Sequence, residues 1–311
     1  MKKHIAILFV IAGSLSTVSC IGGGGALTAD SAPQIMTTFA TLVGQLPKGN
    51  KTATLPSDLN SGGVTVSSLE MKASPRLSCE SSTPASPVDA DGDGIALLKQ
   101  YTFNCSSYVG SGYTYNHLGT FKSIDNNDSV PGLKGGYRFE FDIPTWTSTE
   151  ISSDLTSGGS YSGYWEGSGT DTTSEYKSDY HGSYYADYDI ASLGKVSVDY
   201  DFSHQFDVKY THNSTAVGAN WSSGSMEATG AFMFDGQFVD EDSNGVHRLK
   251  NGQATMTWKT ENVTFDSGCA KWYKTGRFLL TDTGGNKLRT EFNCTEVKVY
   301  FNDKELDGNF W

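Results

Sequence analysis

The stretch Val196-Ser-Val-Asp-Tyr200-Asp-Phe-Ser-His204-Gln-Phe-Asp-Val208-Lys-Tyr210 decides the fold class of this chain. Its even-numbered residues are apolar or aromatic except His204, and its odd-numbered residues are polar or charged. Strict alternation puts the two sets on opposite faces of a β-strand, one face dry and the other in water. The stretch is longer than a usual strand of about 5–6 residues. It therefore predicts either one long curved strand or a hairpin that turns near Ser203–Gln205.

The same alternation recurs from about residue 64 onward. Residues 137–143 alternate aromatic or aliphatic side chains with charged ones. A further strand is predicted to carry five apolar residues on one face: Met226, Ala228, Phe232, Phe234 and Phe238. Shorter strand candidates are residues 253–259, 262–266, 275–281 and 287–302. This pattern is typical of an antiparallel sheet with one buried face.

Tyrosines recur every four residues at positions 176, 180, 184 and 188. That spacing alone fits a helix, but the small residues Ser178, Gly182 and Ala186 between them favour a strand face that alternates large and small side chains. The preceding residues 157–173 are rich in glycine. We interpret them as a mobile loop or the tip of a hairpin.

Composition supports a β fold. The chain has 35 Gly, 16 Tyr and 16 Phe but only 8 Pro. We predict a mainly β protein with one large antiparallel, curved sheet, sandwich-like or barrel-like, in residues 64–311, because no linker divides that range. In residues 32–63 we expect one short N-terminal helix followed by a loop. The helix is predicted from four apolar residues that share a helical face: Ile35, Phe39, Leu42 and Val43.

The N-terminus has the form of a bacterial export signal. Two lysines precede a short apolar run, and small residues follow up to Ser19. The sequence Thr17-Val18-Ser19-Cys20 resembles the lipobox of bacterial lipoproteins, although that family prefers Leu, Val or Ile where Thr17 stands. The resemblance implies a signal peptide at residues 1–19 and a lipidated Cys20. The alternative is an ordinary secretory signal cut after Ser19, which leaves Cys20 as a free thiol.

Residues 20–31 form a tether in this interpretation. Gly22 to Gly25 follow Cys20 directly, and such a run makes a flexible spacer between an anchor and a folded domain. A cysteine followed by several glycines is similar to the tether of Neisseria-type surface lipoproteins. Ile21 is not the aspartate that retains lipoproteins in the inner membrane of enteric bacteria. The resemblance therefore implies anchoring to the outer membrane, with the periplasmic or surface face left open.

The remaining four cysteines form two pairs with nearly equal spacing: Cys79 with Cys105, and Cys269 with Cys294. Four cysteines allow three connectivities. We predict these two local disulfides because each would staple one hairpin. Zinc is the competing interpretation, but the short Cys-x-x-Cys spacing and nearby histidines of a zinc site are missing.

One motif suggests metal chemistry. Asp89, Asp91 and Asp93 alternate before Gly94, and Ile95 follows. This resembles the first half of an EF-hand-type calcium loop, in which three carboxylates and then the backbone carbonyl of Ile95 would be ligands. The pattern departs from the family at the ninth and twelfth positions, Leu97 and Gln100. The alternatives are therefore a truncated calcium turn and an acidic turn that only links two strands.

Charge and motifs exclude several function classes. The net charge of −12 disfavours binding to nucleic acid or to anionic lipid headgroups. No Gly-x-Ser-x-Gly elbow, His-Glu-x-x-His or phosphate-binding glycine loop occurs. We predict a protein without catalytic activity. On the apolar face of its strand, His204 is expected to be a core residue with its hydrogen bonds satisfied rather than a base.

We therefore expect a lipid-anchored envelope protein that acts as a non-enzymatic binding or structural module. Its partner would be a protein, a glycan or an apolar ligand. Two alternatives stay open: a carrier of an apolar ligand in a curved β-sheet, and an integral outer-membrane β-barrel. The terminal Phe310-Trp311 and the dyad repeats favour the barrel. The predicted disulfides and the lipobox disfavour it, as do acidic residues on the face of Trp311.

Overall fold

The computed structural model describes residues 79–110, 113–190, 193–213, 222–241, 247–270 and 273–306. The predicted signal peptide, Cys20, the tether and the predicted N-terminal helix lie outside these residues. The described elements are one short 3-10 helix, η1 (Gly132–Lys134), and thirteen strands. The strands are β1 (Glu80–Thr83), β2 (Leu98–Gly110), β3 (Tyr113–Asp125), β4 (Tyr137–Glu150), β5 (Thr156–Gly169), β6 (Thr173–Ile190), β7 (Gly194–His212), β8 (Ser223–Glu241), β9 (His247–Asp266), β10 (Tyr273–Asp282), β11 (Lys287–Asn293), β12 (Glu296–Phe301) and β13 (Lys304–Glu305).

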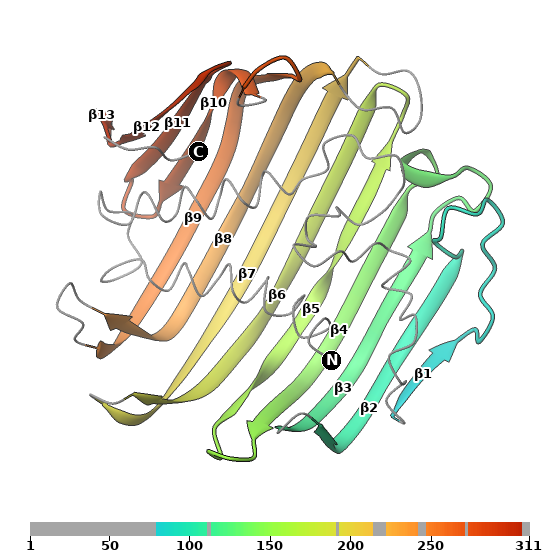
Figure 1. The fold of residues 1–311 in the computed structure, drawn as a ribbon, viewed down its shortest axis with the longest axis vertical. Helices are drawn as coiled ribbons and strands as arrows, with labels where there is room; N and C mark the ends of the chain where they lie inside the picture. Colours follow the sequence, from blue (N-terminus) through green and yellow to red (C-terminus); the bar gives the residue numbers. More distant parts are fainter. Residues whose placement is uncertain are drawn as a thin grey trace.

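All thirteen strands belong to one open sheet, and their order in the sheet is their order in the chain (Figure 1). Every neighbouring pair is antiparallel. This meander follows from the sequence because alternating strands joined by turns pair most simply with the strand before and the strand after. The predicted large antiparallel, curved sheet is confirmed.

The stretch that decides the fold class is one strand. β7 spans 19 residues and does not turn near Ser203–Gln205, because Gln205 pairs with Asp179 of β6 and with Ala231 of β8. β8 is equally long, and the predicted apolar positions from Met226 to Phe234 lie within it. Long strands are stable here because each is paired on both sides along most of its length.

The glycine-rich residues 157–173 are not a loop; most of them form β5. Their glycines pair with the tyrosines of β6: Gly167 with Tyr176, Gly163 with Tyr180, and Gly159 with Tyr184. At Gly163 the backbone has φ +152°, and a Cβ atom would lie 2.2 Å from the carbonyl oxygen of Asp179. Glycine is therefore required at Gly163 by a close approach of two strands, not by a turn.

Two strand predictions need correction near the C-terminus. Residues 253–259 and 262–266 form one strand, β9, which continues through Asn262 although that residue has φ +51°. Residues 287–302 form two strands instead of one, because Cys294 and Thr295 make a tight turn between β11 and β12. A positive φ at a non-glycine residue is uncommon, and the alternation of side chains does not reveal it.

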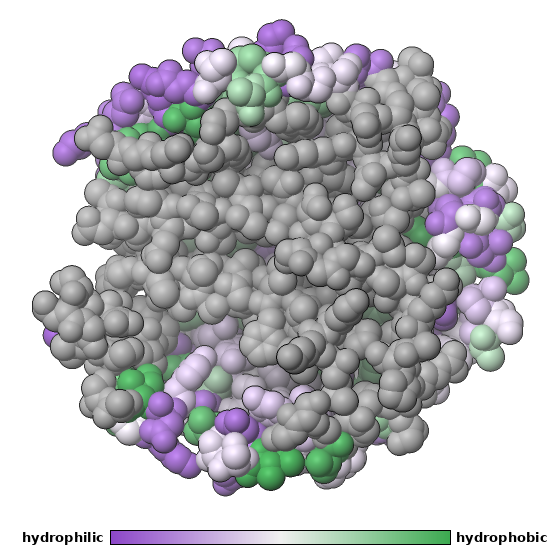
Figure 2. Space-filling view, in the orientation of Figure 1, coloured by the Kyte–Doolittle hydropathy of each residue, from purple (hydrophilic) through white to green (hydrophobic). Residues whose placement is uncertain are grey.

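Both ends of the strands carry large exposed apolar side chains; at one end these are Val88, Leu97 and Leu98. The other end, with the β2–β3, β4–β5 and β6–β7 turns, has several large apolar side chains that are exposed: Val109, Tyr113, Ile151, Tyr188 and Leu193. Figure 2 shows hydrophobic residues beside hydrophilic ones along the lower margin, where Figure 1 places the β2–β3 and β4–β5 turns. We call these five side chains the apolar end. Among the described residues, no helix is long and apolar enough to cross a membrane.

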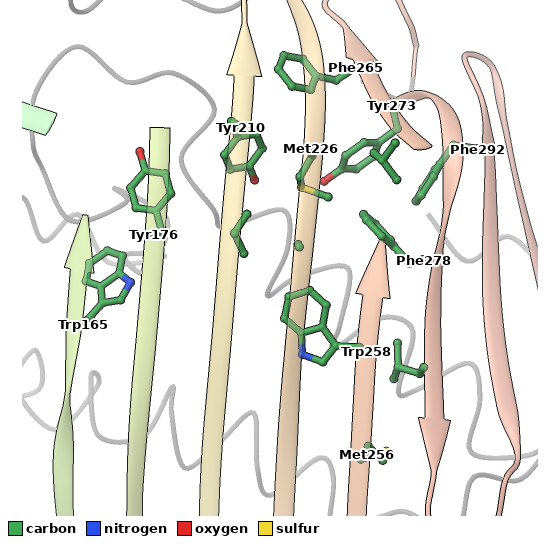
Figure 3. Close-up of a cluster of buried hydrophobic side chains, with 14 of the residues drawn as sticks. Trp165, Tyr176, Tyr210, Met226, Met256, Trp258, Phe265, Tyr273, Phe278 and Phe292 are labelled. Atoms are coloured by element: carbon green, nitrogen blue, oxygen red, sulfur yellow. The ribbon is translucent and has the colours of Figure 1, made fainter. Parts of the chain in front are cut away.

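The core lies on one face of the sheet and extends from β4 to β12. Figure 3 shows side chains of this core on that face, with labels on ten of them, from Trp165 on β5 to Phe292 on β11. Tyr210, Val208 and Phe278 are at most 1% exposed. The opposite face carries cross-strand ion pairs such as Lys209 with Glu175. The predicted division into a dry and a wet face is thus present in the folded sheet.

Candidate functional site

Both predicted disulfides are present. Cys79 bonds Cys105 and ties the start of β1 to β2, as expected for a hairpin staple. Cys269 bonds Cys294 and joins the β9–β10 turn to the β11–β12 turn, so it staples two turns and not one hairpin. The first lies at the β1 edge of the sheet, and the second lies at the ends of strands β9 to β12.

The candidate site lies where two connections meet at one end of the sheet. The first, the β1–β2 loop, comprises residues 84–97, and the second, the β3–β4 loop, comprises residues 126–136. They meet because β2 and β3 are neighbours, so the residue before β2 lies beside the last residue of β3. The backbone N–H of Asp125 donates to the carbonyl of Ala96 at 3.2 Å.

Asp89 and Asp93 build the β1–β2 loop. Asp89 accepts hydrogen bonds from the backbone N–H groups of Gly92 and Gly94 at 2.8 and 3.0 Å. Asp93 accepts one from Ile95 at 2.7 Å and one from Gly132, in the β3–β4 loop, at 2.8 Å. Each carboxylate oxygen of these two residues thus has a backbone donor. They act first as loop scaffolding.

Asp91 differs from its two neighbours. One of its oxygens accepts a hydrogen bond from the N–H of Asp93 at 3.1 Å. The other, Oδ2, is buried and has no hydrogen-bond partner in the part of the chain that the structure describes. Of the three predicted carboxylate ligands, only Asp91 thus presents an unpartnered buried oxygen.

The structure adds Asp125 and Asp128, which we did not predict as ligands. Asp125 is only 3% exposed, and no described residue donates a hydrogen bond to its Oδ2. Asp128 accepts a hydrogen bond from the N–H of Ala90 at 2.8 Å, which ties it to the β1–β2 loop. One oxygen each from Asp91, Asp125 and Asp128 lies within 4.8 Å of the other two, and Asp89, Asp91 and Asp93 form a second such group.

The structure explains why the EF-hand-like pattern stops after Ile95. Leu97 is exposed, and the chain enters β2 at Leu98. Gln100 pairs with Thr83 and Lys122 in the sheet, so it does not return to the aspartates. The additional carboxylates come from the β3–β4 connection, about 34 residues beyond Asp91. The signal that could have found them is the run Asp125-Asn-Asn-Asp128 directly after a strand.

Electrostatics at the site are unfavourable for the protein alone. Burial raises the pKa of Asp125, and the nearby carboxylates of Asp93, Asp91 and Asp128 raise it further. The pKa of Asp91 is raised by burial and by Asp93 and Asp89. Within the described part of the chain, none of these five aspartates forms an ion pair with a lysine or arginine. A cation would relieve this repulsion.

The histidines stand apart from the acidic residues. His181 shares a hydrogen bond of 3.1 Å with Ser162 on the wet face. His204 is buried among aromatic rings, as predicted. Its Nδ1 has no hydrogen-bond partner among the described residues, so within them it is not the fully satisfied core histidine that we expected. Neither residue belongs to a cluster that could hold a metal ion in the described residues.

No protein-family model, curated protein sequence or solved structure shows a significant match to this chain. Its function is therefore argued from its own residues.

Proposed function

We propose that this chain is an exported protein of a bacterial cell envelope, anchored to the outer membrane by lipid at Cys20. Its open sheet works as a non-enzymatic module that binds a partner protein. The observation that carries the binding role is the apolar end, because exposed apolar side chains that gather at one place mark interaction surfaces.

Export is supported by the disulfides Cys79–Cys105 and Cys269–Cys294. Disulfides form and persist in oxidising compartments such as the bacterial periplasm. The export signal and the lipobox-like sequence before Cys20 point to the same compartment.

The apolar end favours a partner of a definite chemistry. Val109 and Ile151 are 62% and 57% exposed. Carboxylates predominate among the charged side chains beside these turns: Glu150, Asp154, Asp187 and Asp189, with Lys195 donating to the carbonyl of Ser153. An acidic rim around apolar side chains is complementary to a protein surface with apolar residues bordered by Lys and Arg. It also repels the anionic headgroups of a membrane surface.

The anchor is tested by mass spectrometry of the N-terminal peptide from cells that express the full chain. We expect an acylated Cys20 and recovery in the outer-membrane fraction. The Cys20→Ala variant should be released in soluble form. An unmodified thiol at Cys20 would contradict the anchor.

The binding role is tested by photo-crosslinking in cells, with a crosslinking amino acid at Val109 or at Ile151. Val88 and Leu97 are matched controls, because they are 63% and 53% exposed but lie on the β1–β2 loop at the other end of the strands. We expect one discrete protein adduct from the apolar end and none from the controls.

The adduct should disappear when Tyr188→Asp, on β6 at the same end of the strands, is added to the crosslinking variant. The identified partner, once purified, should bind the exported protein more weakly as salt is raised, because the rim contact is electrostatic. Equal adducts from all four positions, or adducts to lipid instead of protein, would overturn the proposed binding role.

A further inference from the structure

Two aspartates where the β1–β2 and β3–β4 loops meet, Asp91 and Asp125, each have a buried carboxylate oxygen without a described hydrogen-bond partner. Asp125 is only 3% exposed, and its Oδ2 has no hydrogen-bond partner among the described residues. The Oδ2 of Asp91 is likewise buried and has no partner there. Buried carboxylates are normally paired or bind a metal, because burying an uncompensated charge is costly.

The separation of these oxygens fits one ion. Ca²⁺ holds its oxygen ligands at 2.3–2.6 Å, so two ligands of the same ion are at most about 5 Å apart. One oxygen each of Asp91, Asp125 and Asp128 lies within 4.8 Å of the other two. The three oxygens therefore lie close enough together to be ligands of one cation.

The donor set selects the class of metal. Every candidate ligand is a carboxylate oxygen, and no histidine or cysteine joins either group in the described residues. Hard cations prefer such ligands, whereas zinc prefers nitrogen and sulfur. The ligands come from two separate, irregular loops. Such an arrangement suits the flexible coordination of Ca²⁺ better than the strict octahedron of Mg²⁺.

We propose that Asp91, Asp125 and Asp128 bind one Ca²⁺ ion, which ties the β1–β2 loop to the β3–β4 loop. Asp89 and Asp93 hold the β1–β2 loop in shape through the backbone N–H groups of Gly92, Gly94, Ile95 and Gly132. Of the three carboxylates in the predicted half-loop, the proposed site therefore uses only Asp91. It is independent of the partner protein and of the apolar end.

The ion would hold the β1–β2 and β3–β4 loops together at one end of the strands. The β1–β2 and β3–β4 loops are already joined by Ala90 N–H to Asp128 and by Gly132 N–H to Asp93. A cation among the carboxylates would remove the repulsion that opposes these contacts. Affinities of extracellular calcium modules lie at about 10⁻⁴–10⁻³ M, so calcium outside the cytoplasm would fill the site.

The experiment uses the full exported protein, stripped with EGTA and titrated with CaCl2 by calorimetry, with MgCl2 in parallel. We expect one Ca²⁺ per chain and weaker binding of Mg²⁺. At 10 mM CaCl2 the melting temperature should rise by about 3–8 °C. No heat of binding and no thermal shift at this concentration would overturn the proposal.

Three variants locate the ion. Asp128→Asn removes a half-buried ligand and should weaken calcium binding by at least about tenfold. Asp125→Asn should do the same. If it fails to fold, Asp128→Asn carries the test. Asp142→Asn makes the same charge change at an exposed position on β4 and should leave binding unchanged.

Asp89→Asn distinguishes the proposed site from the EF-hand-like half-loop that the sequence pattern predicts. Asp89 would be the first ligand of an EF-hand-like loop, but in the proposed site it only positions backbone. Its loss should weaken calcium binding much less than the loss of Asp128. Calcium affinity that falls equally in Asp89→Asn and Asp128→Asn, or that survives in Asp128→Asn, would overturn the assignment.

Discussion

His204 lies on the dry face of β7, where its ring stacks on Phe232 with 4.4 Å between ring centroids. Tyr180 of β6 meets it edge-on at 5.0 Å. Burial lowers the pKa of His204 to about 3. Alternation placed His204 on this face correctly, because the period of a strand is strict. It did not show that the buried Nδ1 would lack a partner, because hydrogen bonding depends on neighbours far away in the sequence.

The lowered pKa of His204 makes stability depend on pH. Unfolded chains bind a proton at His204 below a pKa of about 6.5, whereas the folded chain resists it down to a pKa of about 3. Stability should therefore fall as the pH falls from 6.5 toward 3, by about 1.4 kcal/mol per pH unit from this group. We would measure the free energy of unfolding in urea at pH 7, 6, 5 and 4. His204→Phe should remove the part of its pH dependence that comes from His204.

His181→Phe is the control, because His181 is exposed and bonds only Ser162 among the described residues. An acid slope that is the same in His204→Phe and in the wild type would contradict the assigned burial.

Gly163 tests the close approach of β5 and β6. An alanine there would need φ +152° and would put its Cβ 2.2 Å from the carbonyl oxygen of Asp179. We expect Gly163→Ala to lower the free energy of unfolding by more than about 3 kcal/mol. Gly194→Ala shares the positive φ, at +73°, but its Cβ meets nothing within 4 Å, so it should cost only about 1 kcal/mol. Equal losses in urea unfolding would mean that contact with β6 is not the cause.

At the scale of elements, the strands were predictable and their ends were not. Alternation found β7 and β8, because each buries one continuous face. It failed at β5, since the glycines that signal a loop in isolation here pair with the tyrosines of β6. It also missed the turn at Cys294, whose φ of +23° leaves no trace in the pattern of apolar residues.

The second disulfide joins two turns, so its loss should loosen the C-terminal strands. Cys269 and Cys294 are 25 residues apart. By loop entropy, the double variant Cys269→Ser/Cys294→Ser should lower the free energy of unfolding by about 3–4 kcal/mol. Urea unfolding under non-reducing conditions measures this loss. Unchanged stability would show that these two turns hold together without the bond.

At the scale of the whole molecule, the proposed calcium site and the proposed binding surface lie at opposite ends of the strands. The acidic residues of the β1–β2 and β3–β4 loops lie at one end, and the apolar end lies at the other. The half of the acidic site in residues 89–95 could be predicted, because it lies within a few residues of sequence. Asp125 and Asp128 were not predicted: their run after a strand marks an acidic loop, but only the pairing of β2 with β3 shows that this loop lies beside Asp91.

The central claim is that this sheet is a binding module and not a carrier of an apolar ligand. Native mass spectrometry of the exported protein, released by Cys20→Ala and purified without detergent in the presence of CaCl2, tests it most directly. We predict the mass of the polypeptide with both disulfides and one Ca²⁺ ion. A discrete apolar adduct that survives purification would contradict the claim and make the protein a carrier.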